Sequence, residues 1–472
     1  MIVMNPLLNP KIMFPFLKNY ILDSGRLISS TPKKIQKYKD KALRHMVKFA
    51  YNVPLYHDRY KEAGVHPSDI HGIKDLRKLP MITKDDIRQN FPDKIVPTNF
   101  NKNNGHVICT GGTTGKPVCL YTNFLTIGKG LSTTIRELKL LKINPKKTRS
   151  VHIGNFNQYR IDLVARDHFY KHLKLFYSDK NILNIDVNTP ILEMIENLEK
   201  FNPDIIISYP AIFQHLAFFR RKGKGKNIKP KTCWTGGAML DDYTRKYVEE
   251  AFGTRLLNIY PSVEACGDIA FECLKGKWHV NDDFYHLEAM DENGEILDPG
   301  KRGHLVITRL WGYATPIIRY TGMDDWVKLL YDVKCDCGIC STVIKNGVEG
   351  RMRANIVLPS GKVFPPGAFC FIEPVVSKYK TFKIKQYQVV QKKIDEIDVL
   401  LVIDDDLRNV GPSVETIMKE VEAIYQQKSG PDVKITVKEV KEIKPEKGSS
   451  KPPPIVVSHI KIDEGYKVLE NA

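Results

Sequence analysis

One short segment combines the residue types that hold phosphate groups, because residues 109–117 are CTGGTTGKP. Its glycines permit positive φ and a close approach of the backbone to a ligand, its threonines supply hydroxyl donors, and its lysine adds a positive charge. The residues concerned are Thr110, Gly111, Gly112, Thr113, Thr114, Gly115 and Lys116. A plain turn between two strands is the alternative, because short glycine-rich matches recur by chance.

The segment is not a Walker A loop. That loop needs four residues between its first glycine and the Gly-Lys pair, and a serine or threonine after the lysine. Here three residues separate Gly111 from Gly115, and Pro117 follows Lys116. The remaining prediction is a mobile loop that covers a polyphosphate.

Alternating strands and helices are expected to position this loop. Helical periodicity covers much of residues 31–95, and AIFQHLAFFRR later has the same spacing. The runs RSVHIGN, PDIIISYP, KTCWTGG and RLLNIYP are short and apolar, as buried parallel strands are. In such sheets, ligands bind beyond the carboxyl ends of the strands. The glycine loop, Gly236-Gly237 and Tyr260 all follow predicted strands.

The last part of the chain predicts a separate small unit. From about residue 303 the pattern changes to β structure, and after residue 380 KQYQVVQKK and IDVLLVIDDD predict a strand pair. A helix is expected to start behind Pro412 and Ser413, and DVKITVKEV predicts a further strand. The tail, KPEKGSSKPPPIVV, carries Lys444, Lys447 and Lys451 and has the composition of a flexible linker.

A group of cysteines and one histidine has the composition of a metal site. Cys273 and His279 flank the segment LKGKW, and CDCGIC adds Cys335, Cys337 and Cys340. Three thiolates and one imidazole would satisfy tetrahedral Zn²⁺. Free buried thiols are the alternative.

The composition is that of a globular protein with more than one domain. The chain has 472 residues, of which 27% are charged and 42% hydrophobic, so disorder is not expected. The net charge of +18 is unusual. Because the lysines are spread along the chain among acidic residues, they favour a solvated basic surface over a specific nucleic-acid site.

Nothing in the sequence predicts a membrane protein or a secreted one. The apolar beginning, MIVMNPLLNPKIMFPFLKNYIL, is interrupted by prolines and lysines, which predicts a packed arm. Nine cysteines without a secretory signal indicate a reducing cytoplasm, where clustered cysteines bind metals more often than they form disulfides.

Four further patterns follow the glycine loop in order: TGGAML (235–240), NIYPSVEACG (258–267), PIIRYTGMDD (316–325) and GVEGRMRANIVLPSGKVFPP (347–366). Together they resemble the core motifs of the adenylate-forming superfamily of acyl-CoA ligases and adenylation domains. VPLYHDRYKEAGVHPSDIHGIKDLRKLPMITKDDIR and the C-x-C-G after Asp324 resemble the phenylacetate-CoA ligase branch. The resemblance covers residues from about 50 to 460.

The resemblance implies an ATP site. Tyr260 would stack on adenine, Glu264 would bind Mg²⁺, and Asp324 would accept hydrogen bonds from both ribose hydroxyls. Arg319 stands near this site in the sequence and would neutralise phosphate. The other implied nucleotide-binding residues are Gly236, Gly237, Ala238, Pro261 and Ser262. Taken singly, a core tyrosine, a surface glutamate and a turn aspartate are the alternatives.

The resemblance also implies a catalytic lysine on the tail. Lys451 occupies the superfamily's position for it, with Ser450 where glycine is usual, and Lys447 is the rival. A positive charge there would offset the negative charge that develops as a carboxylate attacks the α-phosphorus. Arg353-Ala354 stand where paired acids are usual at the hinge.

Two smaller features complete the implied site. Pro261 and Val263 stand where glycine and a threonine or serine are commoner, so the local geometry beside Glu264 is left open. Some members of the branch hold a structural zinc ion, which the resemblance places on Cys273, His279, Cys335 and Cys337, with Cys340 spare.

The implied fold is α/β, with a large multi-sheet N-terminal adenylate-forming region over residues 1–351 and a small mobile α+β C-terminal domain over residues 352–472 that carries the catalytic lysine. The implied activity is ATP-dependent conversion of a small carboxylic acid to acyl-AMP, followed by transfer to a thiol, coenzyme A first. The acid pocket is expected around residues 152–160 and 234–239. An adenylyltransferase that stops at AMP transfer and a non-catalytic basic nucleic-acid-binding protein are the alternatives, and a homodimer is allowed.

Overall fold

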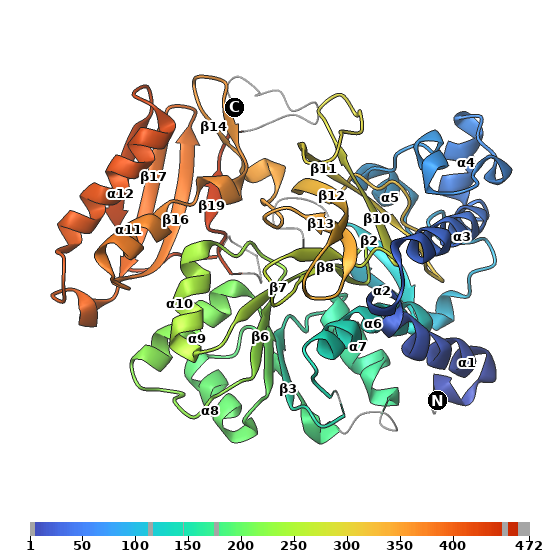
Figure 1. Cartoon of the computed structure of the whole chain (residues 1–472), viewed down its shortest axis with the longest axis horizontal. Helices are drawn as coiled ribbons and strands as arrows, with labels where there is room; N and C mark the ends of the chain where they lie inside the picture. Colours follow the sequence, from blue (N-terminus) through green and yellow to red (C-terminus); the bar gives the residue numbers. More distant parts are fainter. Residues whose placement is uncertain (1–4, 112–116, 145, 174–178, 446–451, 461–472) are drawn as a thin grey trace.

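The computed structural model describes residues 5–111, 117–144, 146–173, 179–445 and 452–460. Its N-terminal helices gather at one end of the molecule, in blue in Figure 1. They are α1 (Pro10–Lys18), α2 (Ser24–Ser29), α3 (Pro32–Ala50), α4 (Pro54–Glu62) and α5 (Lys84–Asn90). Helix α3 begins where the Thr31 side chain accepts a hydrogen bond from the backbone N–H of Lys34. Leu43, Met46 and Val47 recur on its buried face, as the periodicity predicted.

The glycine loop joins the two strands of a short hairpin, β1 (Gly105–Cys109) and β2 (Cys119–Asn123), which leads into helix α6 (Phe124–Leu140). Cys109 and Cys119 lie opposite each other in the antiparallel register and form a disulfide. The sequence, which indicated a reducing cytoplasm, did not predict this disulfide, which forms because the register places both side chains on one face of the hairpin. The other seven cysteines are free thiols.

Parallel strands connected by helices follow, as predicted. All four apolar runs form strands of this region, whereas β4 and α6 were not anticipated. The strands are β3 (Ser150–Gly154), β4 (Ile182–Asp186), β5 (Ile205–Ser208), β6 (Thr232–Thr235) and β7 (Leu256–Ser262). The helices are α7 (Ile161–His168), α8 (Ile191–Phe201), α9 (Pro210–Arg221) and α10 (Asp242–Phe252). Their strand order is β7-β6-β5-β3-β4, with every neighbouring pair parallel.

The same sheet continues beyond β7 with antiparallel strands. In the described part of the chain it is 11-stranded, and the added strands run in the order β10-β11-β12-β13-β9-β8 up to β7. These strands are β8 (Gly267–Glu272), β9 (Trp278–Val280), β10 (Tyr285–Met290), β11 (Arg302–Arg309), β12 (Trp326–Lys334) and β13 (Cys340–Ile344). Strands β11 and β12 lie in the region predicted to be β structure, but the change comes earlier than residue 303, because β8, β9 and β10 already follow β7 without a helix between them.

A smaller unit of sheet and helices ends the described chain. It contains a 4-stranded sheet in the order β18-β17-β16-β19. Its elements are β14 (Ile356–Val357), β15 (Val363–Phe364), α11 (Ile372–Tyr379), β16 (Ile384–Lys393), β17 (Glu396–Ile403), α12 (Val414–Ser429), β18 (Lys434–Glu439) and β19 (Val456–Ser458). Helix α12 starts with Ser413 as its cap, as predicted. The proposed boundary at residues 351 and 352 stays a prediction.

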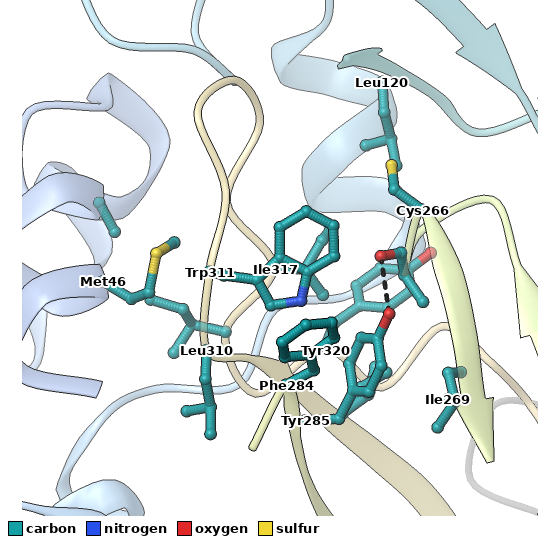
Figure 2. Packing of buried hydrophobic residues seen from close by; sticks show 14 of the residues in the cluster. Met46, Leu120, Cys266, Ile269, Phe284, Tyr285, Leu310, Trp311, Ile317 and Tyr320 are labelled. Atoms are coloured by element: carbon teal, nitrogen blue, oxygen red, sulfur yellow. Dashed lines mark hydrogen bonds between the residues drawn. The ribbon is translucent and has the colours of Figure 1, made fainter. Parts of the chain in front are cut away.

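Two large apolar clusters form the core. One joins the N-terminal helices to the antiparallel half of the large sheet, and Figure 2 shows Met46 of α3 close to Leu310 and Trp311 there. The other joins the parallel strands and α8–α10 to the C-terminal unit, so that Phe213 and Tyr425 lie in one continuous cluster. Figure 1 shows the C-terminal unit, in orange and red, beside α10.

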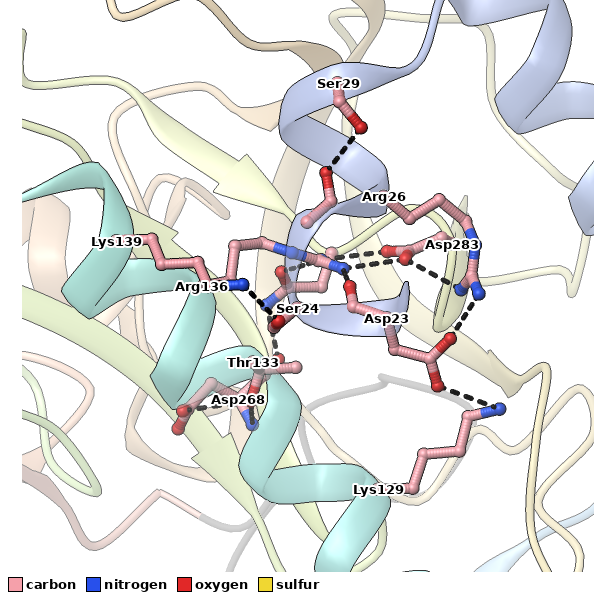
Figure 3. A network of polar contacts seen from close by, with 12 residues as sticks. Asp23, Ser24, Arg26, Ser29, Lys129, Thr133, Arg136, Lys139, Asp268 and Asp283 are labelled. Carbon is pink, nitrogen blue, oxygen red and sulfur yellow. Dashed lines mark hydrogen bonds and ion pairs between the residues drawn. The ribbon is translucent and has the colours of Figure 1, made fainter. Parts of the chain in front are cut away.

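A buried polar network ties the N-terminal arm to α6 (Figure 3). The fully buried guanidinium of Arg136 donates to both carboxylate oxygens of Asp283, at 2.8 and 2.7 Å, and to the backbone oxygen of Asp23 at 2.6 Å. Arg26 lies 3.3 Å from Asp283, and Lys129 lies 3.5 Å from Asp23. Bidentate pairing of this kind fixes geometry as well as charge. The predicted packed arm ends just before Asp23, and in its described part Leu7 and Phe16 are packed into the core, whereas Phe14 and Ile21 are exposed.

No helix in the described ranges is long and apolar enough to cross a membrane.

Candidate active site

A cavity of about 1150 Å³ opens beyond the carboxyl ends of the parallel strands. It is lined by residues that follow β5, β6 and β7, by the base of the glycine loop, and by the C-terminal unit. In an α/β sheet this edge is where ligands bind. The cavity brings together Thr110, Gly111, Gly236, Gly237, Ala238, Tyr260, Pro261, Ser262, Glu264 and Asp324, all of which the sequence had indicated.

Tyr260 is held in place by a neighbour that sequence reasoning missed. It lies near the end of β7, where the register with β8 shifts between Tyr260 and Pro261. Its hydroxyl donates to Oδ2 of Asp325. Burial raises the pKa of the Asp325 carboxyl, and the positive charge of Arg351 opposes that shift. The bond fixes the tyrosine ring at the wall of the cavity.

Glu264 is a buried carboxyl group that faces the cavity from the turn between β7 and β8. The Ser262 hydroxyl donates to its Oε2 at 3.1 Å. Burial raises the pKa of Glu264, while the positive charge of Arg351 and the bond from Ser262 oppose the shift. The backbone oxygen of Glu264 accepts a 2.9 Å bond from buried Arg309, which anchors the turn.

Asp324 also lines the cavity, and its backbone has a left-handed conformation with φ 55°. Its carboxylate is paired with the Nζ of Lys84, at the start of α5, and its backbone oxygen accepts from Met352 at 2.9 Å. About a third of its side chain is exposed, so a ligand can reach it. No sequence signal pointed to Lys84 as a partner of Asp324.

The turn after β6 approaches its neighbours too closely for a larger residue. A Cβ at Gly236 would lie 2.8 Å from the backbone oxygen of Ile259, and Gly237 has φ 72°. Glycine at both positions lets the backbone lie against β7 beside Tyr260.

At the base of the glycine loop, Thr110 is held by two bonds to Val118. Its N–H donates to the Val118 oxygen at 2.9 Å, and its hydroxyl accepts from the Val118 N–H at 3.0 Å. Gly111 also lines the cavity. The other predicted phosphate-binding residues, Gly112, Thr113, Thr114, Gly115 and Lys116, lie outside the described residues, as does Lys451.

The prediction for Arg319 is wrong. Its guanidinium is buried away from the cavity, 3.3 Å from Glu288 and 2.7 Å from the backbone oxygen of Leu79. Closeness in sequence to Asp324 did not reveal that Glu288 neutralises this charge inside the protein. The arginine that lines the cavity beside Glu264 is Arg351, which lies in the quoted segment GVEGRMRAN.

The C-terminal unit closes one side of the cavity. Gln386 and Tyr387 of β16 line it, together with residues 452–458 that follow the undescribed tail segment. The Tyr387 hydroxyl donates to Asp241 at 2.9 Å, and Tyr243 donates to the backbone oxygen of Ile384. The end of the described tail therefore lies at the same cavity as Glu264.

A separate group of four side chains could hold a metal ion. One ligand atom from each of Cys273, His279, Cys335 and Cys337 lies within 4.8 Å of the others. The Cys337 sulfur is 3.3 Å from Nε2 of His279, and the Cys273 and Cys335 sulfurs are 3.9 Å apart. The sequence set is thus brought together, whereas Cys340 instead contacts the backbone oxygen of Asp332.

The histidine of this cluster is prepared as a neutral ligand. Its Nδ1 lies 2.9 Å from the Ser341 hydroxyl, which leaves Nε2 directed at the sulfurs. Burial lowers the pKa of His279 to about 4. A neutral imidazole beside three thiols is the donor set of a structural zinc site.

Comparisons with known proteins place this geometry in context. No protein-family model matches the chain. The chain is 29% identical over 306 residues to phenylacetate-coenzyme A ligase from Pseudomonas putida, with 61% of the chain and 66% of that enzyme covered. It is 27% identical over 399 residues to the Thermus thermophilus ligase of the same name, with 81% and 84% covered. The chain spans just under two thirds of the first relative and more of the second.

A third relative has another name. Protein CapK from Staphylococcus aureus is 25% identical over 354 residues, with 71% of each chain covered.

Solved structures agree in fold. A 2-hydroxyisobutyryl-CoA ligase with a bound adenylate, in its postadenylation state, has a TM-score of 0.73 at 18% identity over 87% of each chain. The same ligase with coenzyme A in the thioesterification state scores 0.61, at 17% identity over 91% of each chain.

The fold is that of the adenylate-forming ligases, and the cavity lies where the strands of that fold end. Within that class, the sequence is similar to the phenylacetate-coenzyme A ligases.

Proposed function

We propose that this protein is an AMP-forming ligase that activates a carboxylic acid with ATP and passes the acyl group to a thiol, coenzyme A first. The observation that carries the proposal is the single cavity in which Tyr260, Glu264 and Asp324 meet the C-terminal unit. The relatives named phenylacetate-coenzyme A ligase support the same activity.

In this proposal the nucleotide lies across the ends of β6 and β7. The adenine stacks on the ring of Tyr260. The ribose hydroxyls donate to the Asp324 carboxylate, which then shares its oxygens between the ribose and the Lys84 ammonium group. The glycine turn at Gly236 and Gly237 provides room for this close approach. The glycine loop, held at its base by Thr110, covers the phosphates.

Glu264 is the residue that would hold Mg²⁺. A carboxylate is the oxygen ligand that this hard cation prefers, and the Ser262 bond to Oε2 orients the group towards the cavity. When bound, the ion would neutralise the phosphates of ATP. Arg351 adds a fixed positive charge beside the same carboxyl group.

The first half-reaction joins the carboxylate of the acid to the α-phosphorus of ATP and releases pyrophosphate. We assign the balancing positive charge to Lys451, because the described tail re-enters the cavity directly after it, at residues 452–458. In the second half-reaction the sulfur of the thiol attacks the acyl carbon, and AMP leaves. In this proposal the C-terminal domain, residues 352–472, rotates between the two half-reactions, so that Lys451 leaves the cavity and the thiol can enter.

The test is pyrophosphate release from MgATP by purified protein, screened across aryl, fatty and hydroxy acids with and without coenzyme A. We expect release only with a suitable acid, and an acyl-coenzyme A product when the thiol is present. Formation of ADP and phosphate would contradict the proposal. Release of pyrophosphate without any thioester would instead favour the adenylyltransferase, and tight sequence-selective nucleic-acid binding at physiological salt would favour the binding protein.

We further propose that the four-residue Cys/His cluster holds a structural zinc ion. The support is the donor set of three sulfurs and one neutral imidazole. Four protein ligands leave no open position for an activated water. Elemental analysis of protein purified without chelator should find about one zinc per chain, because a tetrahedral site takes one ion.

A further inference from the structure

We propose that the acid substrate is a monocarboxylic acid with an extended apolar body, which lies in a channel along helix α6. This inference rests on the proposed function and deepens it. The channel is the part of the cavity between α6 and the parallel strands. It is much deeper than a single-ring acid requires.

One face of α6 forms the first wall of the channel. Ile127, Leu131, Thr134, Ile135 and Leu138 all line the cavity, and their spacing places them on one side of the helix. Four of the five are apolar. The wall from Ile127 to Leu138 covers eleven steps of the helix, or about 16 Å at 1.5 Å per residue.

Strands β3, β5 and β6 form the second wall. Ser150 is paired with Ile205, and Ile207 with both His152 and Trp234, so these side chains share one face of the sheet. All of them line the cavity. The alternate residues of these strands, such as Ile206 and Cys233, face the opposite core with α8 and α9.

The channel extends away from the part of the cavity in which the carboxylate would react. Near its top, α6 packs so tightly against the turn after Glu264 that a Cβ on Gly130 would lie 1.8 Å from the Cys266 oxygen. Near its bottom, Leu138 packs in one cluster with Ile205, at the beginning of β5. An acid with its carboxylate beside Glu264 would therefore extend its body towards Leu138.

The side chains of the channel walls also indicate that the apolar body of the acid carries no charge. None of the channel residues named above is a lysine or an arginine, and the carboxyl group of Asp268 lines the cavity beside Thr134, whose hydroxyl donates to it at 3.0 Å. A second carboxylate on the substrate would lose its hydration there and meet a carboxyl group instead of a cation. Dicarboxylic acids of the same length should therefore bind more weakly than monocarboxylic acids.

The first experiment measures binding without turnover, so that its result does not depend on catalysis. Acyl sulfamoyl adenosines, which mimic acyl-AMP, carry phenylacetyl, hexanoyl, decanoyl or tetradecanoyl groups, and titration calorimetry gives their affinities. We expect affinity to rise with each added methylene, by up to about fourfold per group that is buried, until the channel is filled. The decanoyl mimic should bind at least tenfold more tightly than one with a terminal carboxylate.

The second experiment plugs the channel at two depths. Leu131→Trp narrows it near the top, and Leu138→Phe narrows it seven helical steps, or about 10 Å, further down. We expect Leu131→Trp to cut the affinity for decanoyl and longer mimics at least tenfold and to spare the phenylacetyl mimic. Leu138→Phe should affect only the longest mimic. Leu140→Trp, on the same helix outside the cavity lining, is the control.

Several results would overturn the proposal. Tightest binding by the phenylacetyl mimic, or loss of affinity at the same chain length in both plugged variants, would show that the channel does not hold the acid. A rise in the KM for coenzyme A with unchanged chain preference would assign the channel to the thiol. If no mimic binds at any length, the proposed function itself fails.

Discussion

Glu264 and Asp268 are two buried carboxyl groups of one cavity whose surroundings differ. Glu264 has the charges of Arg351 and Lys84 nearby, together with a bond from Ser262. Asp268 receives bonds from the hydroxyl groups of Thr133 and Thr134, at 3.2 and 3.0 Å. Burial raises the pKa of both carboxyl groups, but only Glu264 has positive charges nearby that oppose the shift. Glu264 is therefore the better candidate of the two for binding a cation.

Replacement of Glu264 by glutamine should remove this charge with little change of shape, because the Ser262 hydroxyl can still donate to the amide oxygen. We expect acid-dependent pyrophosphate release to fall roughly a hundredfold, as when one preorganised charged group is lost from a transition state. The midpoint of the Mg²⁺ dependence should rise. The exposed Glu292→Gln is the control, and equal activity of both variants would remove Glu264 from the metal site.

Replacement of Asp268 by asparagine should change stability in a pH-dependent way. Burial raises the pKa of this carboxyl group above 3.8. The folded protein then binds the proton more tightly than the unfolded chain, so the stability it contributes is complete below pH 3.8 and is lost as the pH rises through the raised pKa. Asparagine does not titrate. The free energy of unfolding, measured with urea, should therefore rise for Asp268→Asn relative to the wild type between pH 4 and pH 8. A difference between the two proteins that does not change with pH would contradict the pKa shift.

At the scale of elements, the Cys/His cluster joins segments that are distant in sequence. Cys273 follows β8, His279 lies in β9, and Cys335 and Cys337 lie in the connection between β12 and β13. Strand β13 also pairs with β9 through Val343 and His279. A bound ion would therefore reinforce pairing between strands that meet over a long connection.

Replacement of Cys335 by serine should lower the melting temperature and the zinc content together, because one ligand of four is lost. The affinity for ATP should change far less, since the cluster is separate from the nucleotide-binding residues. Cys340→Ser is the matched control, because the Cys340 sulfur contacts Asp332 outside the cluster. Full zinc retention by Cys335→Ser would exclude this site.

The sequence predicted those elements and residues that carry a local signal. Strands β3, β5, β6 and β7 were recognised from apolar runs, and the ordered motifs pointed to Tyr260, Glu264 and Asp324. Lys84 was missed because its pairing with Asp324 spans 240 positions and depends on tertiary contact alone. Arg319 was misplaced for the same reason, because its partner Glu288 is on a neighbouring strand.

At the scale of the whole molecule, side-chain hydrogen bonds attach the C-terminal unit to the start of α10. Asp241 caps this helix and also accepts the bond from Tyr387, while Tyr243 bonds to the backbone of β16. These contacts hold the C-terminal unit against the parallel part of the large sheet and its helices.

Replacement of Tyr387 by phenylalanine should weaken this attachment, because it leaves buried Asp241 without one hydrogen-bond donor. The loss should cost about 1–3 kcal/mol of the free energy that holds the C-terminal unit in place. We expect adenylate formation to slow up to about tenfold, while thioester formation from supplied acyl-AMP is retained. Tyr379→Phe is the control, because its hydroxyl bonds to Glu420 within the same unit. Equal slowing of both steps by Tyr387→Phe would contradict a role in domain arrangement.

Replacement of Lys451 by alanine tests the proposed catalytic charge. Adenylate formation should fall roughly a hundredfold or more, and thioester formation from supplied acyl-AMP should survive. Single-turnover measurements of both steps separate them. If Lys447→Ala shows this pattern and Lys451→Ala does not, the tail has been aligned wrongly with the superfamily.

The buried network of Arg136, Asp283 and Asp23 has a consequence for protein engineering. It anchors α6, whose other face forms the proposed acyl wall, to an N-terminal arm more than a hundred positions away in sequence. Truncating that arm would leave the Arg136–Asp283 pair in place but would remove the Asp23 backbone oxygen that accepts from Arg136 and the Arg26 side chain beside Asp283. A chimera whose first thirty residues come from a relative would therefore also test the choice of acid substrate. Variant libraries aimed at new acids should leave Asp23, Arg136 and Asp283 unchanged.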